Sequence, residues 1–215
     1  MRVLITAGPT REPLDDVRYI SNRSSGKMGY ALAEESVRRG YQTILVSGPA
    51  SLQPPEGVQH VTVETSDEMI DAVIEWLGEG IDVLISSAAI SDFKPDKTNG
   101  KISSGSGLNL VLKPARKLIK VVRDYDKELF LVAFKAEHGA DNQRLVEKAG
   151  KMLVDDGVNL VVANDVSRNI FDSDDTEAVI VGPRGETVMS RMSKAEAASM
   201  IWDVVDDEFR VRSSS

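Results

Sequence analysis

Residues 3–29 constrain the fold of this chain more than any other stretch. They begin with an apolar run at residues 3–5, which predicts a buried parallel strand because both faces of its pleat are apolar. Small and turn-forming residues follow at 6–10, and a polar loop then leads to residues 24–27 (SSGK), where a helix is predicted to begin. Unpaired N–H groups and the dipole at a helix N-terminus favour an anion, so this strand–loop–helix order predicts a phosphate-binding loop.

Two well-known phosphate motifs are excluded in this stretch. Met28 follows Lys27 where a Walker A loop has Ser or Thr, and Gly8 stands alone where a dinucleotide fingerprint has three spaced glycines. The alternative interpretation is that two serines only cap the helix. The candidate phosphate-binding residues are Gly8, Thr10, Ser24, Ser25, Gly26 and Lys27.

Composition predicts one globular domain over residues 1–210, followed by a polar, disordered tail at 211–215. The 215 residues are 41% apolar and 28% charged, which is enough to build a core. A net charge of −8 argues against nucleic-acid binding, and the absence of cysteine excludes disulfides and thiol catalysis and favours a cytoplasmic setting. No stretch approaches a membrane span, and we expect no signal peptide and no membrane partner. His60 and His138 lack metal-ligand spacing, so no metal-binding side chains are expected.

Strand and helix patterns alternate along the rest of the chain. Apolar strands are predicted at 42–46, 59–64, 82–85, 129–134 and 159–163. Helices are predicted after Ser66, from Pro114, over 142–156 and after Ser193. This order is typical of an α/β protein with a doubly wound, mostly parallel sheet and helices on both faces. Small residues at 86–92 follow one strand, and the carboxyl ends of such strands are where these sheets place ligands.

Two segments depart from this pattern. Residues 93–107 carry three lysines and several glycines without core periodicity, and we interpret them as a basic flap over the site; the alternative is a solvated loop without a role. Residues 108–112 alternate like a strand. Residues 176–181 and 186–189 flank a Gly-Pro-Arg-Gly turn, which predicts an antiparallel hairpin at a sheet edge.

Five motifs resemble the phosphopantothenoylcysteine synthetase family: GPTREPLD at 8–15, RYISNRSSGKMG at 18–29, SGP at 47–49, AAISD at 88–92 and ANDV at 163–166. The chain looks like the bacterial and archaeal branch, which uses CTP. The resemblance implies a Rossmann-like, dimeric ligase of coenzyme A biosynthesis. Such an enzyme joins 4′-phosphopantothenate to L-cysteine through an acyl-cytidylate, with CTP and Mg²⁺ as cofactors, and releases pyrophosphate and CMP. The edge hairpin or the flap is expected to carry the dimer contact.

The resemblance also implies catalytic and substrate-binding residues. Asn22 would stabilise the acyl-cytidylate while the amine adds, or it is only a turn residue. Lys101 would act in forming the cytidylate, with Lys97 as a competitor for that role. Arg18 would hold the phosphate of phosphopantothenate, because a guanidinium fork suits a dianion; the alternative is an ion pair with Asp15 or Asp16.

Nucleotide contacts are implied along the strand ends and one helix. The candidates are Ser86, Ala88, Asp92, Phe134, Lys148 and Lys151. Asp92 could instead cap the following segment, and Phe134 could be core. The two helix lysines match the family spacing poorly. Asn164 and Asp165 are expected to shape the rim of the sheet without a catalytic role.

Two other functions fit the same fold class. A short-chain oxidoreductase would need Tyr followed four residues later by Lys, and none of the four tyrosines has that spacing. A nucleotide-binding module without catalysis is the second alternative. Pyrophosphate release that depends on both phosphopantothenate and CTP would distinguish an enzyme from such a module.

Overall fold

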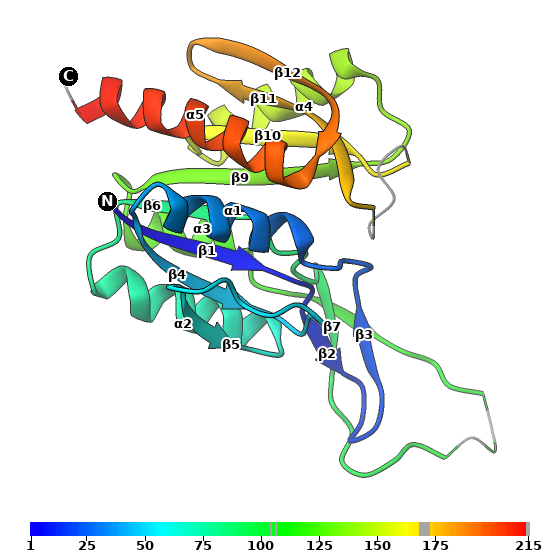
Figure 1. The fold of residues 1–215 in the computed structure, drawn as a ribbon. Helices are drawn as coiled ribbons and strands as arrows, with labels where there is room; N and C mark the ends of the chain where they lie inside the picture. The colour runs from blue at the N-terminus through cyan, green and yellow to red at the C-terminus, as the bar shows by residue number, and fades with distance from the viewer. Residues whose placement is uncertain (104, 106, 168–172, 214–215) are drawn as a thin grey trace.

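A central sheet organises the computed structural model, which describes residues 1–103, 105, 107–167 and 173–213 (Figure 1). Within the described residues it has eight strands in the order β12-β11-β10-β9-β6-β1-β4-β5. The strands are β1 (Arg2–Ala7), β4 (Gln42–Ser47), β5 (Gln59–Thr62), β6 (Val83–Ser86), β9 (Phe130–Glu137), β10 (Leu160–Asp165), β11 (Asp175–Gly182) and β12 (Gly185–Ser193). The six strands from β10 to β5 pair in parallel, and β11 and β12 are antiparallel.

Helices cover both faces of this sheet, as the alternating pattern predicts. On one face, α1 (Lys27–Arg38) and α5 (Lys194–Ser213) pack against Val3 and Ile5. On the other face lie α2 (Ser66–Gly78), α3 (Leu118–Tyr125) and α4 (Asn142–Asp155), which pack against Leu4. Both faces of β1 are therefore buried, which explains its unbroken apolar run. The doubly wound α/β fold is confirmed.

The strand order creates a crevice at the carboxyl ends of β1 and β6. The chain runs from β1 outward to β4 and β5, and then returns to place β6 on the other side of β1. Connections that leave two neighbouring strands in opposite directions open a gap between their following loops, and open α/β sheets bind ligands there. In this chain the backbone bridges the two strand ends just beyond the sheet, where Pro9 pairs with Ala89.

The segment between β1 and α1 is a hairpin rather than the expected polar loop. Strands β2 (Arg11–Pro13) and β3 (Tyr19–Ser21) are antiparallel and three residues long each. Asp15 makes the turn, because its carboxylate accepts hydrogen bonds from the backbone N–H groups of Val17 and Arg18, both at 2.8 Å. Such short strands, one of them ending in proline, leave no alternation to recognise in the sequence.

The predicted flap forms part of a second hairpin. Its strands are β7 (Phe93–Pro95) and β8 (Leu112–Pro114). The predicted strand at 108–112 is therefore wrong except for its last residue, and no helix begins at Pro114, which pairs with Phe93; α3 starts only at Leu118. Leu108, Leu110 and Val111 are exposed, so their alternation reflects no buried sheet face.

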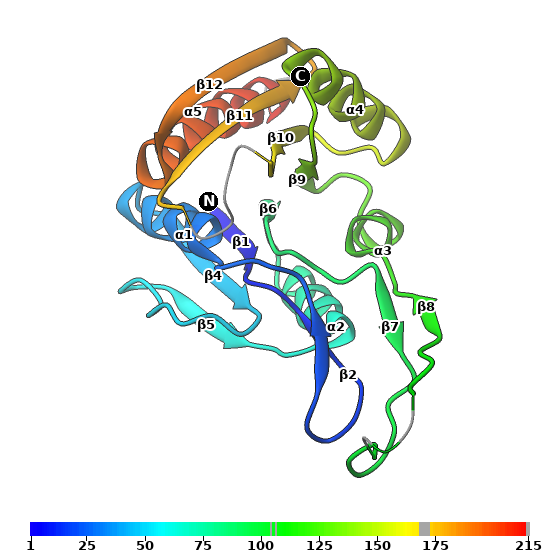
Figure 2. The ribbon, with the colours of Figure 1, turned by 90° about the vertical axis from the view of Figure 1, so that its right-hand side faces the viewer.

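We call residues 11–21 and 93–114 together the arm. Figures 1 and 2 show both hairpins extending from the same edge of the molecule, beyond the carboxyl ends of the parallel strands. They are joined by backbone hydrogen bonds from Thr98 to Leu14, at 3.0 Å, and from Asp16 to Gly100, at 3.2 Å. Residues 104 and 106 of the expected flap lie outside the described residues.

The C-terminal half largely follows the prediction. The edge hairpin β11–β12 is confirmed, and Ser193 caps α5: its hydroxyl accepts from the N–H of Glu196 at 3.2 Å. Thr65, not Ser66, caps α2, because the threonine hydroxyl accepts from the N–H of Glu68. Helix α5 continues to Ser213, so residues 211–213 of the expected disordered tail are helical, and 214–215 lie outside the described residues.

None of the helices in the described part of the chain combines the length and the apolar composition that a membrane crossing requires.

Candidate functional site

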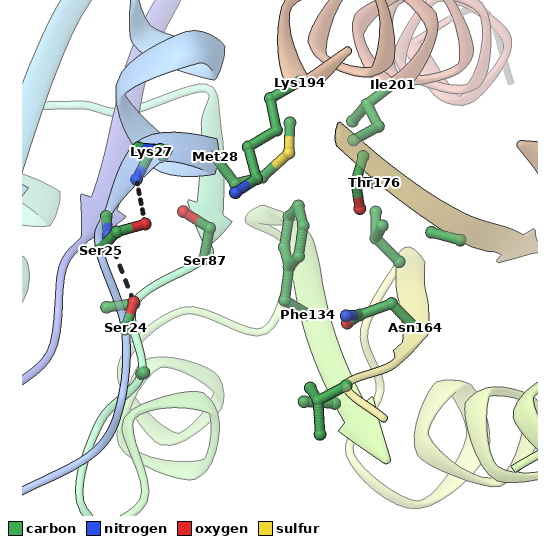
Figure 3. A pocket seen from close by; sticks show the side chains of 18 of the residues that line it. Ser24, Ser25, Lys27, Met28, Ser87, Phe134, Asn164, Thr176, Lys194 and Ile201 are labelled. Carbon is green, nitrogen blue, oxygen red and sulfur yellow. Dashed lines mark hydrogen bonds between the residues drawn. The ribbon is translucent and has the colours of Figure 1, made fainter. Parts of the chain in front are cut away.

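A cleft of about 170 Å³ lies at the carboxyl ends of the parallel strands, between the N-terminal ends of α1 and α5 (Figure 3). One wall is the segment from Ser24 to Gly29, and the floor is the loop after β6 at Ser87, Ala88 and Ala89. The opposite wall comes from β9, β10, β11 and α5. Its side chains include Phe134, Val162, Asn164, Thr176, Lys194 and Ile201.

Close backbone packing brings the start of α1 up to the end of β1. Gly8 has φ 73°, and a Cβ atom there would lie 2.8 Å from the carbonyl oxygen of Gly48. Gly26, the N-cap of α1, has φ 78°, and a Cβ there would lie 3.3 Å from the Cα of Gly8. A side chain at either position would therefore be strained in dihedral angle, and at Gly8 it would also clash. These glycines shape the loop, and Gly8 is placed behind the cleft lining.

The two serines do form local caps. The hydroxyl of Ser24 accepts from the N–H of Gly26 at 3.3 Å, and that of Ser25 accepts from the N–H of Lys27 at 3.5 Å (Figure 3). They do not satisfy the whole first turn: the backbone N–H groups of Met28 and Gly29 have no acceptor within the described residues. The capping interpretation and the phosphate-loop interpretation are therefore compatible, because two helix N–H groups remain at the cleft wall.

Two lysines from different helices reach this cleft. Lys27 forms an ion pair with Asp174, at 2.9 Å between Nζ and Oδ1, and this contact lowers the pKa of the Asp174 carboxyl. Lys194 donates to the backbone carbonyl of Ser173. Lys194 was missed by sequence reasoning, which treated residues after Ser193 only as the start of a helix. No local pattern connects a lysine near position 194 with a loop near position 27.

The wall opposite the serines is mostly apolar. Phe134, in the middle of β9, is half-buried and lines the cleft; its predicted place beside the base stays a prediction. Met189 and Ile201 complete this surface, Asn164 adds an amide to it, and Met28 on the serine wall also lines the cleft. An apolar slot with a few polar groups at one end suits a flat heterocycle joined to an anion.

At the end of β6, three predicted residues have different positions. Ala88 lines the cleft. Ser86 is buried beneath it, and Thr10 is fully buried, where its hydroxyl accepts from the N–H of Ser91 at 3.0 Å and donates to the Ser91 hydroxyl at 3.3 Å. Thr10 and Ser86 therefore support the two strand ends from below. Their predicted contacts with a nucleotide stay predictions.

Asn22 joins the β2–β3 hairpin to the end of β6. Its Nδ2 group donates to the carbonyl oxygens of Ala89 and Ile90, at 3.1 Å each. It lines a second, larger groove of about 1090 Å³ that shares Ser24, Ser25 and Lys27 with the cleft. The side chain of Asn22 is therefore fixed by two hydrogen bonds at the border between the cleft and the groove. A residue that only forms a turn would not need these contacts.

Three predicted site residues, two cations and one acid, are paired away from the cleft lining. Arg18 bonds Asp15, with Nε 2.9 Å from Oδ2, and donates to the carbonyl of Ile102 at 2.8 Å. This is the ion-pair alternative for Arg18, and it holds the pKa of Asp15 well below its usual range. Asp92 is exposed and pairs with Lys117. Lys148 pairs with Glu137, whose pKa it lowers.

Lys151 and Lys101 also lie outside the cleft lining. Lys151 is exposed on α4, 4.0 Å from Asp155. Lys101 is exposed in the arm and has no ion pair among the described residues. Its competitor Lys97 pairs with Asp16 at 2.9 Å, which lowers the pKa of that acid. Lys101 is not among the residues that line the cleft within one copy of the chain.

Within the described ranges, no group of three or more His, Asp or Glu side chains is arranged to hold a metal ion.

Comparisons with known proteins place the chain in a family. The sequence profile of the family described as "DNA/pantothenate metabolism flavoprotein C-terminal domain" matches residues 1–209. The chain belongs to this family. The family predicted from the motifs is thereby confirmed.

Similar proteins cover the whole domain. The chain is 42% identical to the coenzyme A biosynthesis bifunctional protein CoaBC of Thermococcus kodakarensis, over 95% of the chain and 51% of that protein. The chain is 34% identical to the Escherichia coli protein of the same name, again over 95% of the chain and 51% of that protein. The chain thus spans about half the length of these relatives.

Solved structures of the family share the fold. A crystal structure of the C-terminal domain of CoaBC superposes with a TM-score of 0.79 at 33% identity and covers 99% of this chain and 96% of its own. A Cab2 mutant in complex with phosphopantothenate-cysteine gives the same TM-score at 20% identity, over 99% of this chain and 88% of its own, and supports the fold alone.

Proposed function

We propose that this chain is the ligase that joins 4′-phosphopantothenate to L-cysteine in coenzyme A biosynthesis, with CTP as co-substrate. The observation that carries the proposal is the cleft itself, where open helix N–H groups and two lysines face an apolar slot with an aromatic side chain. Membership of the family and the names of the relatives support it. We place the reaction in the cytoplasm.

The chemistry requires two group transfers. A carboxylate oxygen of phosphopantothenate attacks the α-phosphorus of CTP, and pyrophosphate leaves. The amine of cysteine then attacks the acyl carbon of the acyl-cytidylate, CMP leaves with the electron pair of the broken C–O bond, and the amine loses a proton. Neither step needs a nucleophile from the protein. Proximity of two anionic substrates and neutralisation of phosphate charge carry the catalysis.

The first transfer uses the cleft wall at the start of α1. In our proposal the N–H groups of Met28 and Gly29 and the ammonium of Lys27 hold the triphosphate, and Phe134 lies against the cytosine. Mg²⁺ would be held by the triphosphate and water rather than by a side-chain cluster of the described residues, because this small, hard cation prefers phosphate and water ligands. When bound, it supplies positive charge beside the leaving pyrophosphate.

The second transfer takes place near Asn22. Its amide, fixed by two backbone carbonyls, lies in the groove next to the cleft. We propose that phosphopantothenate occupies this groove, with its carboxylate directed toward the shared wall at Ser24 and Ser25. Arg11 and Arg23 also line the groove and supply positive charge for the phosphate end.

Lys101 reaches an active site only if the arm of one copy of the chain lies against the cleft of another copy. We propose that a homodimer brings them together. The arm exposes apolar side chains: Val17 at 62%, Tyr19 at 50%, Phe93 at 52% and Val111 at 74%. Apolar groups gathered on one projecting element are typical of a surface that a partner covers. A second copy of the chain is the occupant that also delivers a lysine to the reaction.

A pyrophosphate-release assay tests the proposed function. With phosphopantothenate and cysteine present, we expect release with CTP and at least about tenfold less with ATP at equal concentration. Omission of phosphopantothenate should abolish release. Binding of CTP without any release would instead support the nucleotide-binding module.

A further inference from the structure

Lys194 is brought to the cleft by the packing of α5 on α1. Trp202 of α5 is fully buried and donates from Nε1 to the carbonyl of Leu32 at 2.9 Å. Toward the other end of α1, Arg39 pairs with Asp203 and Asp206 of α5, at 2.7 and 2.8 Å. The two helices therefore run side by side in the same direction, and their N-terminal ends meet at the cleft (Figure 1).

This alignment concentrates positive charge at one mouth of the cleft. Lys27 is the first residue of α1, and Lys194 is the first residue of α5. Both line the cleft and the neighbouring groove along the outer face of α1. Two helix dipoles add partial positive charge at the same point. Figure 3 shows the Lys194 side chain entering the space between the two walls, and Lys27 at the α1 wall.

The ammonium groups of Lys27 and Lys194 contact oxygens of residues 173 and 174. Lys27 contacts the carboxylate of Asp174 at 2.9 Å, and Lys194 donates to the carbonyl of Ser173. The carboxylate is 89% exposed, and exposed ion pairs hold weakly. A phosphate could make the same contacts, because its oxygens can accept hydrogen bonds from both ammonium groups in place of the Asp174 carboxylate and the Ser173 carbonyl.

We propose that Lys194 and Lys27 together form a binding site for the polyphosphate chain of the nucleotide, and that Asp174 is a built-in competitor which this chain displaces. The inference deepens the proposed function, on which its substrate rests, by assigning a second cation from α5. No bond is made or broken in the exchange: the carboxylate of Asp174 returns to water and phosphate oxygens take its place. Pyrophosphate, the first product, contains the same group and should bind at the same site.

Calorimetric titration with inorganic pyrophosphate tests the site without the reaction. Lys194→Gln should weaken binding by about tenfold, because one charge-assisted contact is lost, and Lys194→Arg should keep most of it. Asp174→Asn should tighten binding about two- to fivefold, because the competing charge is removed. Lys120→Gln, an exposed lysine of α3, is the matched control and should bind as the parent does.

Steady-state kinetics separate binding from a structural role. Lys194→Gln should raise KM for CTP by the same factor as the pyrophosphate Kd, with KM for cysteine unchanged. If Lys194 had only a structural role, Lys194→Gln would lower Tm and leave the affinity for pyrophosphate intact. If Lys194→Gln does not fold, the affinity of Asp174→Asn for pyrophosphate still tests the site. Unchanged affinity in Lys194→Gln, weaker affinity in Asp174→Asn, or no binding by the parent overturns the inference. Lysine-dependent binding of pyrophosphate without turnover of CTP would leave the site standing and refute the ligase.

Discussion

At the scale of single residues, Asn22 has the most sharply defined position among the predicted catalytic groups. Both hydrogens of its amide are engaged by the carbonyls of Ala89 and Ile90, at the end of the strand that neighbours β1. Its Oδ1 atom is the part of the side chain that remains for a substrate donor, such as the attacking amine. This geometry links one side chain to both the shape of the cleft edge and the second transfer.

Asn22→Asp should slow the second transfer far more than the first. A carboxylate cannot donate to the two carbonyls, and it adds negative charge beside an anionic intermediate. We expect a loss of about 10²-fold in overall rate and accumulation of acyl-cytidylate, measured by rapid quench and chromatography. Asn142→Asp, at the exposed start of α4, is the control. Parent-like turnover in Asn22→Asp would remove this residue from the mechanism.

Lys101 and Lys97 can be distinguished by parallel substitution. Lys97 is already paired with Asp16, whereas Lys101 has no ion pair in the described part of the chain. Lys101→Gln should therefore reduce pyrophosphate release by about 10²-fold or more, and Lys97→Gln by less than about threefold. The reverse order would show that the resemblance was transferred to the wrong lysine.

At the scale of secondary-structure elements, the pairing of α1 with α5 positions both cleft lysines. Glu35 is largely buried and receives Arg38 at 2.6 Å and Arg39 at 2.8 Å, while Arg39 continues to α5. These contacts, the Arg38 hydrogen bond first, lower the pKa of Glu35. One carboxylate thus supports an arginine that fixes the relative position of two helices.

Glu35→Gln should lower the free energy of unfolding by about 1–2 kcal/mol at pH 7, because the arginine loses a buried charged partner. The lowered pKa means that this contribution is present above the ordinary pKa of Glu, about 4.3, and is lost as the pH falls through the folded value. Urea denaturation at pH 7 and at lower pH measures the difference, which should shrink on acidification. Glu34→Gln, exposed on the same helix, should be near neutral; an equal effect of both changes would contradict this account.

The elements that could be predicted from the sequence are those with a buried face. The central parallel strands β1, β6 and β9 contain continuous buried apolar runs, and α4 carries a clear stripe that includes Leu145 and Ala149. The β2–β3 hairpin was missed because its strands are short and its order comes from Asp15 contacts rather than from burial of alternate residues. The strand at 108–112 was misplaced because alternation there has no sheet to face.

Site residues that one continuous motif contains were predictable from local sequence. Residues 24–27 come from one continuous segment, so their place at the cleft followed from local sequence. Predicting Lys194 at the cleft would have required knowing that α1 and α5 pack together. The contact of Arg39 with Asp206 between these helices spans 167 positions of the chain. Lys148 and Lys151 were assigned through the resemblance, and their ion pairs with Glu137 and Asp155 are contacts that no motif specifies.

At the scale of the whole molecule, the arm and the cleft are separate features of one chain. The cleft lies among packed strand ends and helices, whereas the arm, which projects from the sheet (Figure 2), includes several exposed apolar side chains and Lys101. The proposed association of two copies through the arm would account for both properties, because it would bury the apolar groups and place a lysine beside a cleft. The edge hairpin β11–β12, the other expected dimer contact, exposes fewer large apolar groups, Val188 among them.

A double change, Phe93→Ser with Val111→Ser, should shift the protein toward monomer. Removing two exposed apolar side chains from a proposed contact should raise the dimer Kd by about 10²-fold, measured by analytical ultracentrifugation. Val154→Ser, on α4 and 83% exposed, is the control for loss of a surface apolar group. A dimer that survives the double change would locate the contact elsewhere.

The central claim is that the strand ends of β1 and β6, with the start of α1, hold the nucleoside triphosphate. A crystal structure of the protein with CTP and Mg²⁺ tests it most directly. We expect phosphate oxygens within hydrogen-bonding distance of the Met28 and Gly29 N–H groups and of Lys27, with the cytosine against Phe134. A triphosphate bound away from residues 24–29 would contradict it.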